Sequence, residues 1–196
     1  MFKNKILLIF ILVGVVGIMI YSFSGSEDYA TTIKKLREEY EQNLSTEKDS
    51  PIATLKDFSG MKYFEPNEKF VITADFKATS GTGQSMILMT DSTTAEMQKS
   101  GEATFTIEGK TFTVSLFDEE TLFLFPFRDL TSGKETYGGG RYMNISKDKL
   151  TGNKIEIDFN TAHNFYCAYN ENFICPIPPK ENFINVAIEA GEKVYK

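Results

Sequence analysis

ATFTIEGKTFTVSLF, residues 103–117, contains the pattern that decides the fold. Hydrophobic and polar residues alternate on both sides of Glu108-Gly109-Lys110, which is typical of two β-strands joined by a tight turn. We therefore predict a β-hairpin here, with one face of each strand directed toward the core.

Other segments on both sides of this hairpin show the two-residue period of strands or a short apolar run. They are FVITADF (70–76), SMILM (85–89), TLFLFPF (121–127), RYMNIS (141–146), KIEIDF (154–159) and NFINVAIEAG (182–191). Segment 121–127 is apolar on both faces and should be deeply buried, with Pro126 near its end or at an edge. Short connections between strands favour antiparallel pairing. The prediction is a mainly β domain, an antiparallel sandwich or barrel of about seven strands, over residues 51–196.

The N-terminus carries an uncharged run, ILLIFILVGVVGIMIYSF, over residues 6–23. As a helix, this run would rise about 27 Å, close to the apolar thickness of a bilayer. Lys3 and Lys5 precede it, whereas Glu27 and Asp28 follow it, so the positive-inside rule places the rest of the chain outside the cytoplasm. Residues 1–25 are thus expected to be a transmembrane anchor, or a signal peptide whose cleavage would give a secreted protein.

Residues 26–50 are predicted to form an amphipathic helix followed by a linker. Ser26 can cap the helix, and Pro51 disfavours helix at the preceding residue. An apolar stripe with helical spacing either packs on the β-domain or pairs with a copy of itself in a homo-oligomer. The stripe consists of Tyr29, Ile33, Leu36, Tyr40 and Leu44.

Composition excludes several function classes. The net charge of −6 argues against nucleic-acid binding, which needs clustered positive charge. A single histidine, His163, and two cysteines, Cys167 and Cys175, limit metal and nucleophile chemistry. We expect no cofactor.

The stretch TSGKETYGGGRY (131–142) has two interpretations. It departs from the phosphate-loop pattern because Gly139 and Gly140 stand where that pattern needs lysine and a hydroxyl residue. As a corner, its glycines would supply positive φ angles, and Arg128 and Arg141 would pair with nearby acidic residues. As an anion site, the two arginines would bind a carboxylate or phosphate that the glycine backbone lets approach.

The segment around the cysteines has three further interpretations. In an exported domain, a Cys167–Cys175 disulfide is the default. A zinc site would need His163, both cysteines and a ligand such as Asp158, in a spacing that no usual structural site shows. His163 and Cys167 are four residues apart and would share one face of a helical turn as a catalytic pair. Buried unpaired thiols are a further alternative.

A set of rare strings in this region resembles one known family. PFRDLTSGKETYGGGRY (126–142), DFN (158–160), CAYN (167–170), CPIPPKEN (175–182) and AGEK (190–193) are similar, in order and approximate spacing, to the domain-of-unknown-function 1684 family. The resemblance implies no activity and no catalytic residue. It implies a shared set of residues: Arg128, Asp129, Gly138, Gly139, Gly140, Arg141, Tyr142, Asp158, Asn160, Cys167 and Cys175.

These patterns favour a membrane-tethered, extracytoplasmic β-domain that binds a small anionic ligand or a partner without catalysis. Two alternatives stay open: a hydrolase or transferase acting on an anionic or acyl substrate, and an envelope assembly component. The predicted binding surface combines arginine charge, tyrosine contact area and glycine backbone. Its residues are Arg128, Arg141, Gly138, Gly139, Gly140, Tyr137, Tyr142, Asp158 and Asn160.

Overall fold

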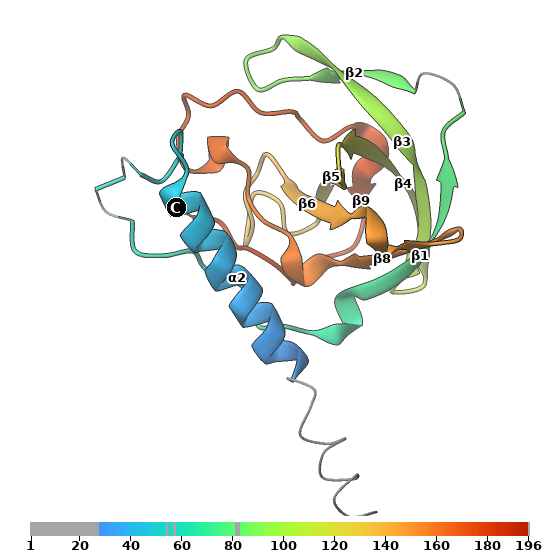
Figure 1. Cartoon of the computed structure of the whole chain (residues 1–196), viewed down its shortest axis with the longest axis horizontal. Coiled ribbons are helices and arrows are strands. Elements are labelled where there is room, and N and C mark those ends of the chain that lie inside the picture. The colour runs from blue at the N-terminus through green and yellow to red at the C-terminus, as the bar shows by residue number, and fades with distance from the viewer. Residues whose placement is uncertain (1–27, 54, 57, 81–82, 196) are drawn as a thin grey trace, which may run out of the picture.

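The computed structural model describes residues 28–53, 55–56, 58–80 and 83–195. Within these ranges one strongly curved, nine-stranded sheet is accompanied by one α-helix, α2 (Tyr29–Thr46) (Figure 1). The strand order is β6-β5-β4-β3-β1-β8-β7, with β2 added to β3 and β9 added to β5. The strands are β1 (Val71–Ala78), β2 (Gln84–Leu88), β3 (Thr94–Ile107), β4 (Lys110–Glu119), β5 (Leu122–Asp129), β6 (Arg141–Ser146), β7 (Leu150–Thr151), β8 (Lys154–Asp158) and β9 (Phe183–Ile184).

The predicted mainly antiparallel β fold is confirmed, but the sheet does not close into a barrel. Every pairing is antiparallel except that between β5 and β9. The described residues contain nine strands, where about seven were predicted. No strand was predicted at β7, which has two residues and is too short to show a period in the sequence.

The predicted hairpin is formed by β3 and β4. Glu108 and Gly109 connect the strands, and their positive φ angles of 48° and 73° fit the right-handed twist of the ladder. Phe105 is buried in the core. On the other face, the hydroxyls of Thr104 and Thr113 form a cross-strand hydrogen bond of 3.0 Å. Alternation of side chains therefore sets the register, as the sequence predicts.

Pro126 lies in β5 beyond the point where β4 stops pairing with that strand, at Leu124. The side chain of Asn182 occupies this gap. Its Nδ2 donates to the carbonyls of Pro126 and Ser115, at 2.7 and 2.9 Å, and its Oδ1 accepts from the Ser115 amide at 2.7 Å. An asparagine thus supplies hydrogen bonds where the ladder is interrupted.

The predicted last strand, 182–191, is wrong for most of its length. Only Phe183–Ile184 pairs as a strand. Beyond it, the Ile188 amide donates to Asp129, and the carbonyls of Ile188 and Ala190 accept from Arg141. The backbone groups of Ile188 and Ala190 thus bond to the side chains of Asp129 and Arg141. They do not pair with a neighbouring strand.

Aromatic rings dominate the core inside the curved sheet. Phe159, at the end of β8, meets Phe127, Phe105 and Phe125 edge-on, with ring centroids 5.3, 6.0 and 6.1 Å apart. Edge-to-face packing at these separations adds to the stabilisation from burial.

Helix α2 lies along one side of the curved sheet (Figure 1). Ile33 and Leu44 of the predicted stripe are buried on the β-domain, while Leu36 is 46% exposed. The predicted packing of this stripe on the β-domain is therefore confirmed for Ile33 and Leu44. No helix in the part of the chain that the structure describes is long and apolar enough to span a membrane. The predicted anchor, residues 6–23, lies outside the described residues.

Candidate ligand-binding site

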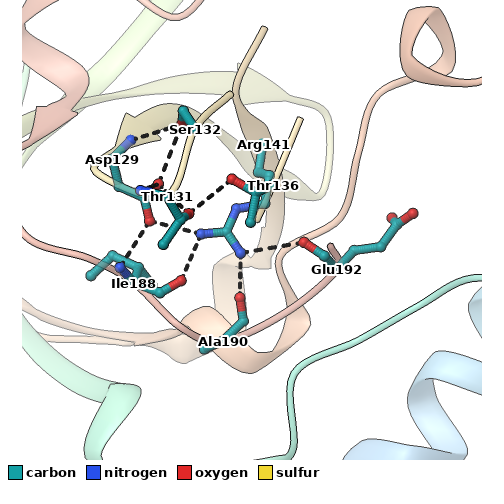
Figure 2. Close-up of polar contacts among 8 residues, drawn as sticks. All are labelled: Asp129, Thr131, Ser132, Thr136, Arg141, Ile188, Ala190 and Glu192. Atoms are coloured by element: carbon teal, nitrogen blue, oxygen red, sulfur yellow. Dashed lines mark hydrogen bonds and ion pairs between the residues drawn. The ribbon is translucent and has the colours of Figure 1, made fainter. Parts of the chain in front are cut away.

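Arg141 is the most fully enclosed charged residue of the glycine-rich region, with 1% of its surface exposed. Its Nη2 donates to Asp129 Oδ2 and to the Ile188 carbonyl, both at 2.8 Å (Figure 2). Its Nη1 donates to the Ala190 carbonyl and, at 3.4 Å, to the Glu192 carbonyl. Burial lowers the pKa of Arg141, and the Asp129 carboxylate opposes that effect. Arg141 therefore joins the start of β6 to the C-terminal segment.

The loop before Arg141 has the geometry of a corner. Asp129 Oδ1 accepts from the amide and hydroxyl of Thr131, at 3.1 and 2.6 Å, and Thr131 shares a hydroxyl bond with Thr136 (Figure 2). Gly140 has a φ of +104°, and a Cβ there would lie 2.6 Å from the Phe127 carbonyl oxygen. A residue larger than glycine does not fit at this position.

The structure separates the other residues of the predicted binding surface. Phe127 is the cross-strand partner of Arg141, so the next residue, Arg128, points to the opposite face and is exposed. Tyr142 is buried and donates its hydroxyl to the Pro176 carbonyl. Tyr137 is half-buried beside Cys167. The two arginines therefore do not converge on one surface.

Asp158 and Asn160 lie together at a cavity of about 420 Å³ between α2 and strands β6 and β8. The walls of this cavity, called here the helix cavity, are mainly apolar and include Ile33, Leu36, Met143 and Ile145. Arg37 and His163 supply polar groups. A mainly apolar pocket of this size with a few convergent polar groups is typical of a small-molecule site.

Arg37 of α2 is the buried cation of the helix cavity, with 9% of its surface exposed. Its Nε and Nη2 donate to the Asn160 carbonyl at 3.3 and 3.0 Å, and Nη1 donates to the Phe64 carbonyl at 2.8 Å. The guanidinium lies 4.6 Å from the centroid of the Tyr63 ring. Among the described residues no carboxylate forms an ion pair with Arg37. Burial lowers its pKa.

Asp158 lies on the same wall, but other groups bind its carboxylate. Tyr29 Oη donates to both of its oxygens, at 2.9 and 3.0 Å. The backbone amide and Nδ2 of Asn160 donate to Oδ1, each at 2.9 Å. Burial and Asp158 both raise the pKa of Tyr29, so this hydroxyl keeps its proton. The Asp158–Tyr29 bond attaches the first turn of α2 to the end of β8.

His163 contributes an unpaired ring nitrogen. Its Nδ1 lies 3.1 Å from the Asn164 carbonyl oxygen and 3.1 Å from the Tyr40 hydroxyl. A carbonyl can only accept, so this contact assigns the proton to Nδ1. Nε2 is buried and has no partner among the described residues. Burial lowers the pKa of His163, so the neutral ring presents a lone pair at Nε2.

The cysteine predictions need correction. Cys167 and Cys175 are free, buried thiols, so the predicted disulfide is not formed. The Cys167 amide instead donates to Cys175 Sγ at 3.2 Å. His163 and Cys167 line different cavities, because Tyr166–Ala168 is a short 3₁₀ turn that begins after His163. No cluster of three metal-ligand side chains occurs in the described ranges.

Sequence reasoning missed Arg37 and Tyr40 as site residues. Arg37 stands on the charged face of α2, which favours solvent exposure in an isolated helix. Its burial follows from the docking of α2, and no local pattern reveals that. Asn160 was predicted, and its Oδ1 also accepts from the Asn67 amide at 2.8 Å.

Two comparisons place the chain among known proteins. The model of the family described as "Protein of unknown function (DUF1684)" matches residues 56–193. The solution NMR structure of an uncharacterised protein from Haloarcula marismortui is similar, with 32% sequence identity and a TM-score of 0.69. The similarity covers 85% of this chain and 94% of that one. No curated protein matches.

Proposed function

The chain belongs to the DUF1684 family, which brings no activity with it, and we propose that the domain binds a small organic anion with an apolar body in the helix cavity. Binding does not involve catalysis. In the same proposal, residues 6–23 tether the domain to a membrane and place it outside the cytoplasm.

One observation carries the proposal: a buried arginine lines the cavity and has no ion-pair partner among the described residues. Within these residues Arg37 donates its hydrogen bonds to the neutral carbonyls of Asn160 and Phe64. A buried charge is costly unless another charge and hydrogen bonds compensate it. An acidic group of a ligand would supply that compensation, because guanidinium binds carboxylates through parallel hydrogen bonds.

The remaining walls define the rest of the ligand. The volume of about 420 Å³ lies within the range of small-molecule pockets. Ile33, Met143 and Ile145 favour an aromatic or branched aliphatic body. His163 also lines the cavity, and its Nε2, buried and without a partner among the described residues, is the proposed acceptor for a hydroxyl or amine on that body. Lys149 and Glu156 also line the cavity, and they form an ion pair with each other at 2.7 Å. Arg37 is therefore the proposed anion-binding group.

The experiment is a calorimetric titration of the full chain with phenylacetate, acetate and phenylethanol. Phenylacetate should bind most tightly, since acetate lacks the apolar body and phenylethanol lacks the charge. Arg37→Gln should weaken phenylacetate binding at least about tenfold, because a hydrogen bond to a charged group contributes about 1.5–3 kcal/mol.

Arg128→Gln is the matched control, because Arg128 is exposed and lies outside the helix cavity. This variant should bind phenylacetate like the parent chain. If Arg128→Gln lost phenylacetate binding and Arg37→Gln kept it, the ligand site would be at the glycine-rich loop and not in the helix cavity. Equal affinity of phenylethanol and phenylacetate would remove the anionic part of the proposal.

The compartment is tested separately. Alkaline phosphatase is active only in a compartment where its disulfides form. The activity of alkaline phosphatase fused to the C-terminus of this chain therefore shows on which side of the membrane the C-terminus lies. We expect an active fusion in the membrane fraction. An inactive fusion would contradict the placement without affecting the cavity.

A further inference from the structure

Two thiols lie next to each other at a second cavity, called here the thiol cavity. Cys167 belongs to the 3₁₀ turn Tyr166–Ala168, and its amide donates to Cys175 Sγ at 3.2 Å. The Tyr137 hydroxyl lies 3.9 Å from Cys167 Sγ. The thiol cavity has a volume of about 250 Å³ and is lined by Cys167 but not by Cys175.

The two sulfurs have different accessibility. Cys167 is 8% exposed, whereas Cys175 is 1% exposed. A molecule in the thiol cavity therefore meets Cys167 first, and Cys175 stands behind it. Dithiols that exchange with disulfides need this arrangement of an accessible attacking sulfur and an adjacent resolving sulfur.

Hydrogen bonding also differs between the thiols. Bonds from the Cys175 thiol and the Tyr137 hydroxyl to Cys167 outweigh burial and lower the pKa of Cys167 to about 7. The same bond raises the pKa of Cys175. The Cys167 amide bond to Cys175 Sγ opposes this rise but does not cancel it. Cys167, which also lines the cavity, is therefore the thiol that ionises more readily. An attacking thiol with a pKa near ambient pH is the most effective in exchange.

The walls of the thiol cavity select the reaction partner. Asp91 and Glu171 line it together with Phe173 and Ile174. Bonds from Thr93 lower the pKa of Asp91, so this carboxylate is charged at neutral pH. Two carboxylates repel anions and attract cations over distances of about 10 Å at moderate salt.

We propose that Cys167 and Cys175 form a redox-active dithiol that reduces a small, positively charged disulfide. The Cys167 thiolate attacks one sulfur of that disulfide, its S–S bond breaks, and the first thiolate leaves. Cys175 transfers its proton to this thiolate and attacks Cys167 Sγ. The mixed S–S bond breaks, the Cys167–Cys175 disulfide forms, and the second thiolate leaves and takes a proton from water. The dithiol loses two electrons, and the small disulfide gains them.

This inference is independent of the proposed function, because the thiol cavity and the helix cavity share no lining residue. It also differs from the structural disulfide predicted from the sequence, since it starts from the reduced pair. Ligand binding in the helix cavity can fail while dithiol chemistry is observed, and the reverse also holds.

The test incubates the reduced full chain with cystamine, a cationic disulfide, or with oxidised glutathione, an anionic one. Samples are quenched over time and analysed by mass spectrometry. With cystamine, the chain should first gain one cysteamine at Cys167 and then lose it as the internal disulfide forms. Cystamine should react at least about fivefold faster than oxidised glutathione at low salt, and the ratio should fall at high salt.

Three variants test the roles. Cys175→Ser should keep the cysteamine on Cys167, and Cys167→Ser should acquire none. Glu171→Gln should reduce the preference for cystamine without changing the order of events. Modification of Cys175 before Cys167, a stable adduct on the parent chain, or equal rates with both disulfides would overturn the proposal. The time course of the parent chain decides the order of events even if a cysteine variant fails to fold.

Discussion

The molecule contains two buried arginines, Arg141 and Arg37, and they differ in what surrounds the guanidinium. Arg141 has a carboxylate, Asp129, and three carbonyls within hydrogen-bonding distance. Arg37 has two carbonyls and the face of a tyrosine ring, and it lines a cavity. A buried arginine with its own carboxylate holds the fold together. We propose that Arg37, which lines a cavity and has no ion-pair partner among the described residues, binds a ligand instead.

The glycine-rich stretch had two interpretations, a structural corner and an anion site, and Arg141 there stands beside three consecutive glycines. In the structure this stretch forms a closed corner, in which the Thr131 hydroxyl is hydrogen-bonded to Asp129 and to Thr136 (Figure 2). The proposed ligand site depends instead on Arg37, a helix residue 123 positions away from Asn160, whose carbonyl accepts two of its hydrogen bonds.

The largest expected effect is on stability at Arg141. Arg141→Met keeps an apolar stem but leaves the Asp129 carboxylate buried without its cation, so the free energy of unfolding should fall by about 3–5 kcal/mol. Adding Asp129→Asn should restore part of the loss, because it removes the uncompensated charge. Urea unfolding of both variants measures this. A loss below about 1 kcal/mol would show that Arg141 is not the structural member of the pair.

An intermediate effect concerns Glu192, next to the Arg141 network. Burial raises the pKa of this carboxyl from 4.5 to about 7. A carboxyl with a raised folded-state pKa stabilises the fold below the unfolded pKa and loses that stabilisation as pH rises toward the folded pKa. Between pH 4.5 and 7 the free energy of unfolding should therefore fall by roughly 1–3 kcal/mol relative to Glu192→Gln. A difference between the two chains that is constant with pH would contradict this pKa.

The smallest expected effect on stability is at Arg37. Arg37→Gln removes hydrogen bonds to the carbonyls of Asn160 and Phe64 but leaves no ion-pair partner without its cation among the described residues, so the free energy of unfolding should fall by only about 1 kcal/mol. The same urea assay applies. If Arg37→Gln were as destabilising as Arg141→Met, the two arginines would have the same structural role, and the distinction between them would fail.

The sequence predicts those elements whose conformation is determined by residues close to one another along the chain. The alternation at 103–117 and the Glu108–Gly109 turn were sufficient to predict β4 and the part of β3 that starts at residue 103. The first part of β3, residues 94–102, was not predicted. The glycine corner at Gly140 was also predictable, because positive φ is a local property.

Features that depend on contacts between residues far apart in the sequence were not predictable. Asn182 bonds to Ser115 and Pro126, 67 and 56 positions away. The strand expected at 182–191 stops at Ile184, because Arg141 and Asp129 take its backbone partners. The helix cavity exists only once α2 docks, so neither Arg37 nor the free Nε2 of His163 could be assigned a role from sequence spacing.

His163 gives the most direct test of the central claim, because it is the single histidine of the chain and lies in the wall of the helix cavity. Nitrogen-15 NMR of the imidazole reports its tautomer, its pKa and any new hydrogen bond at Nε2. We predict a neutral ring protonated at Nδ1, with a pKa below 6.5, whose Nε2 signal shifts when mandelate, a carboxylate with a hydroxyl donor, is added. The shift should be absent in Arg37→Gln and present in Arg128→Gln. An imidazole that titrates at or above pH 6.5, or whose Nε2 signal does not change with bound mandelate, would contradict a ligand site between α2 and the sheet.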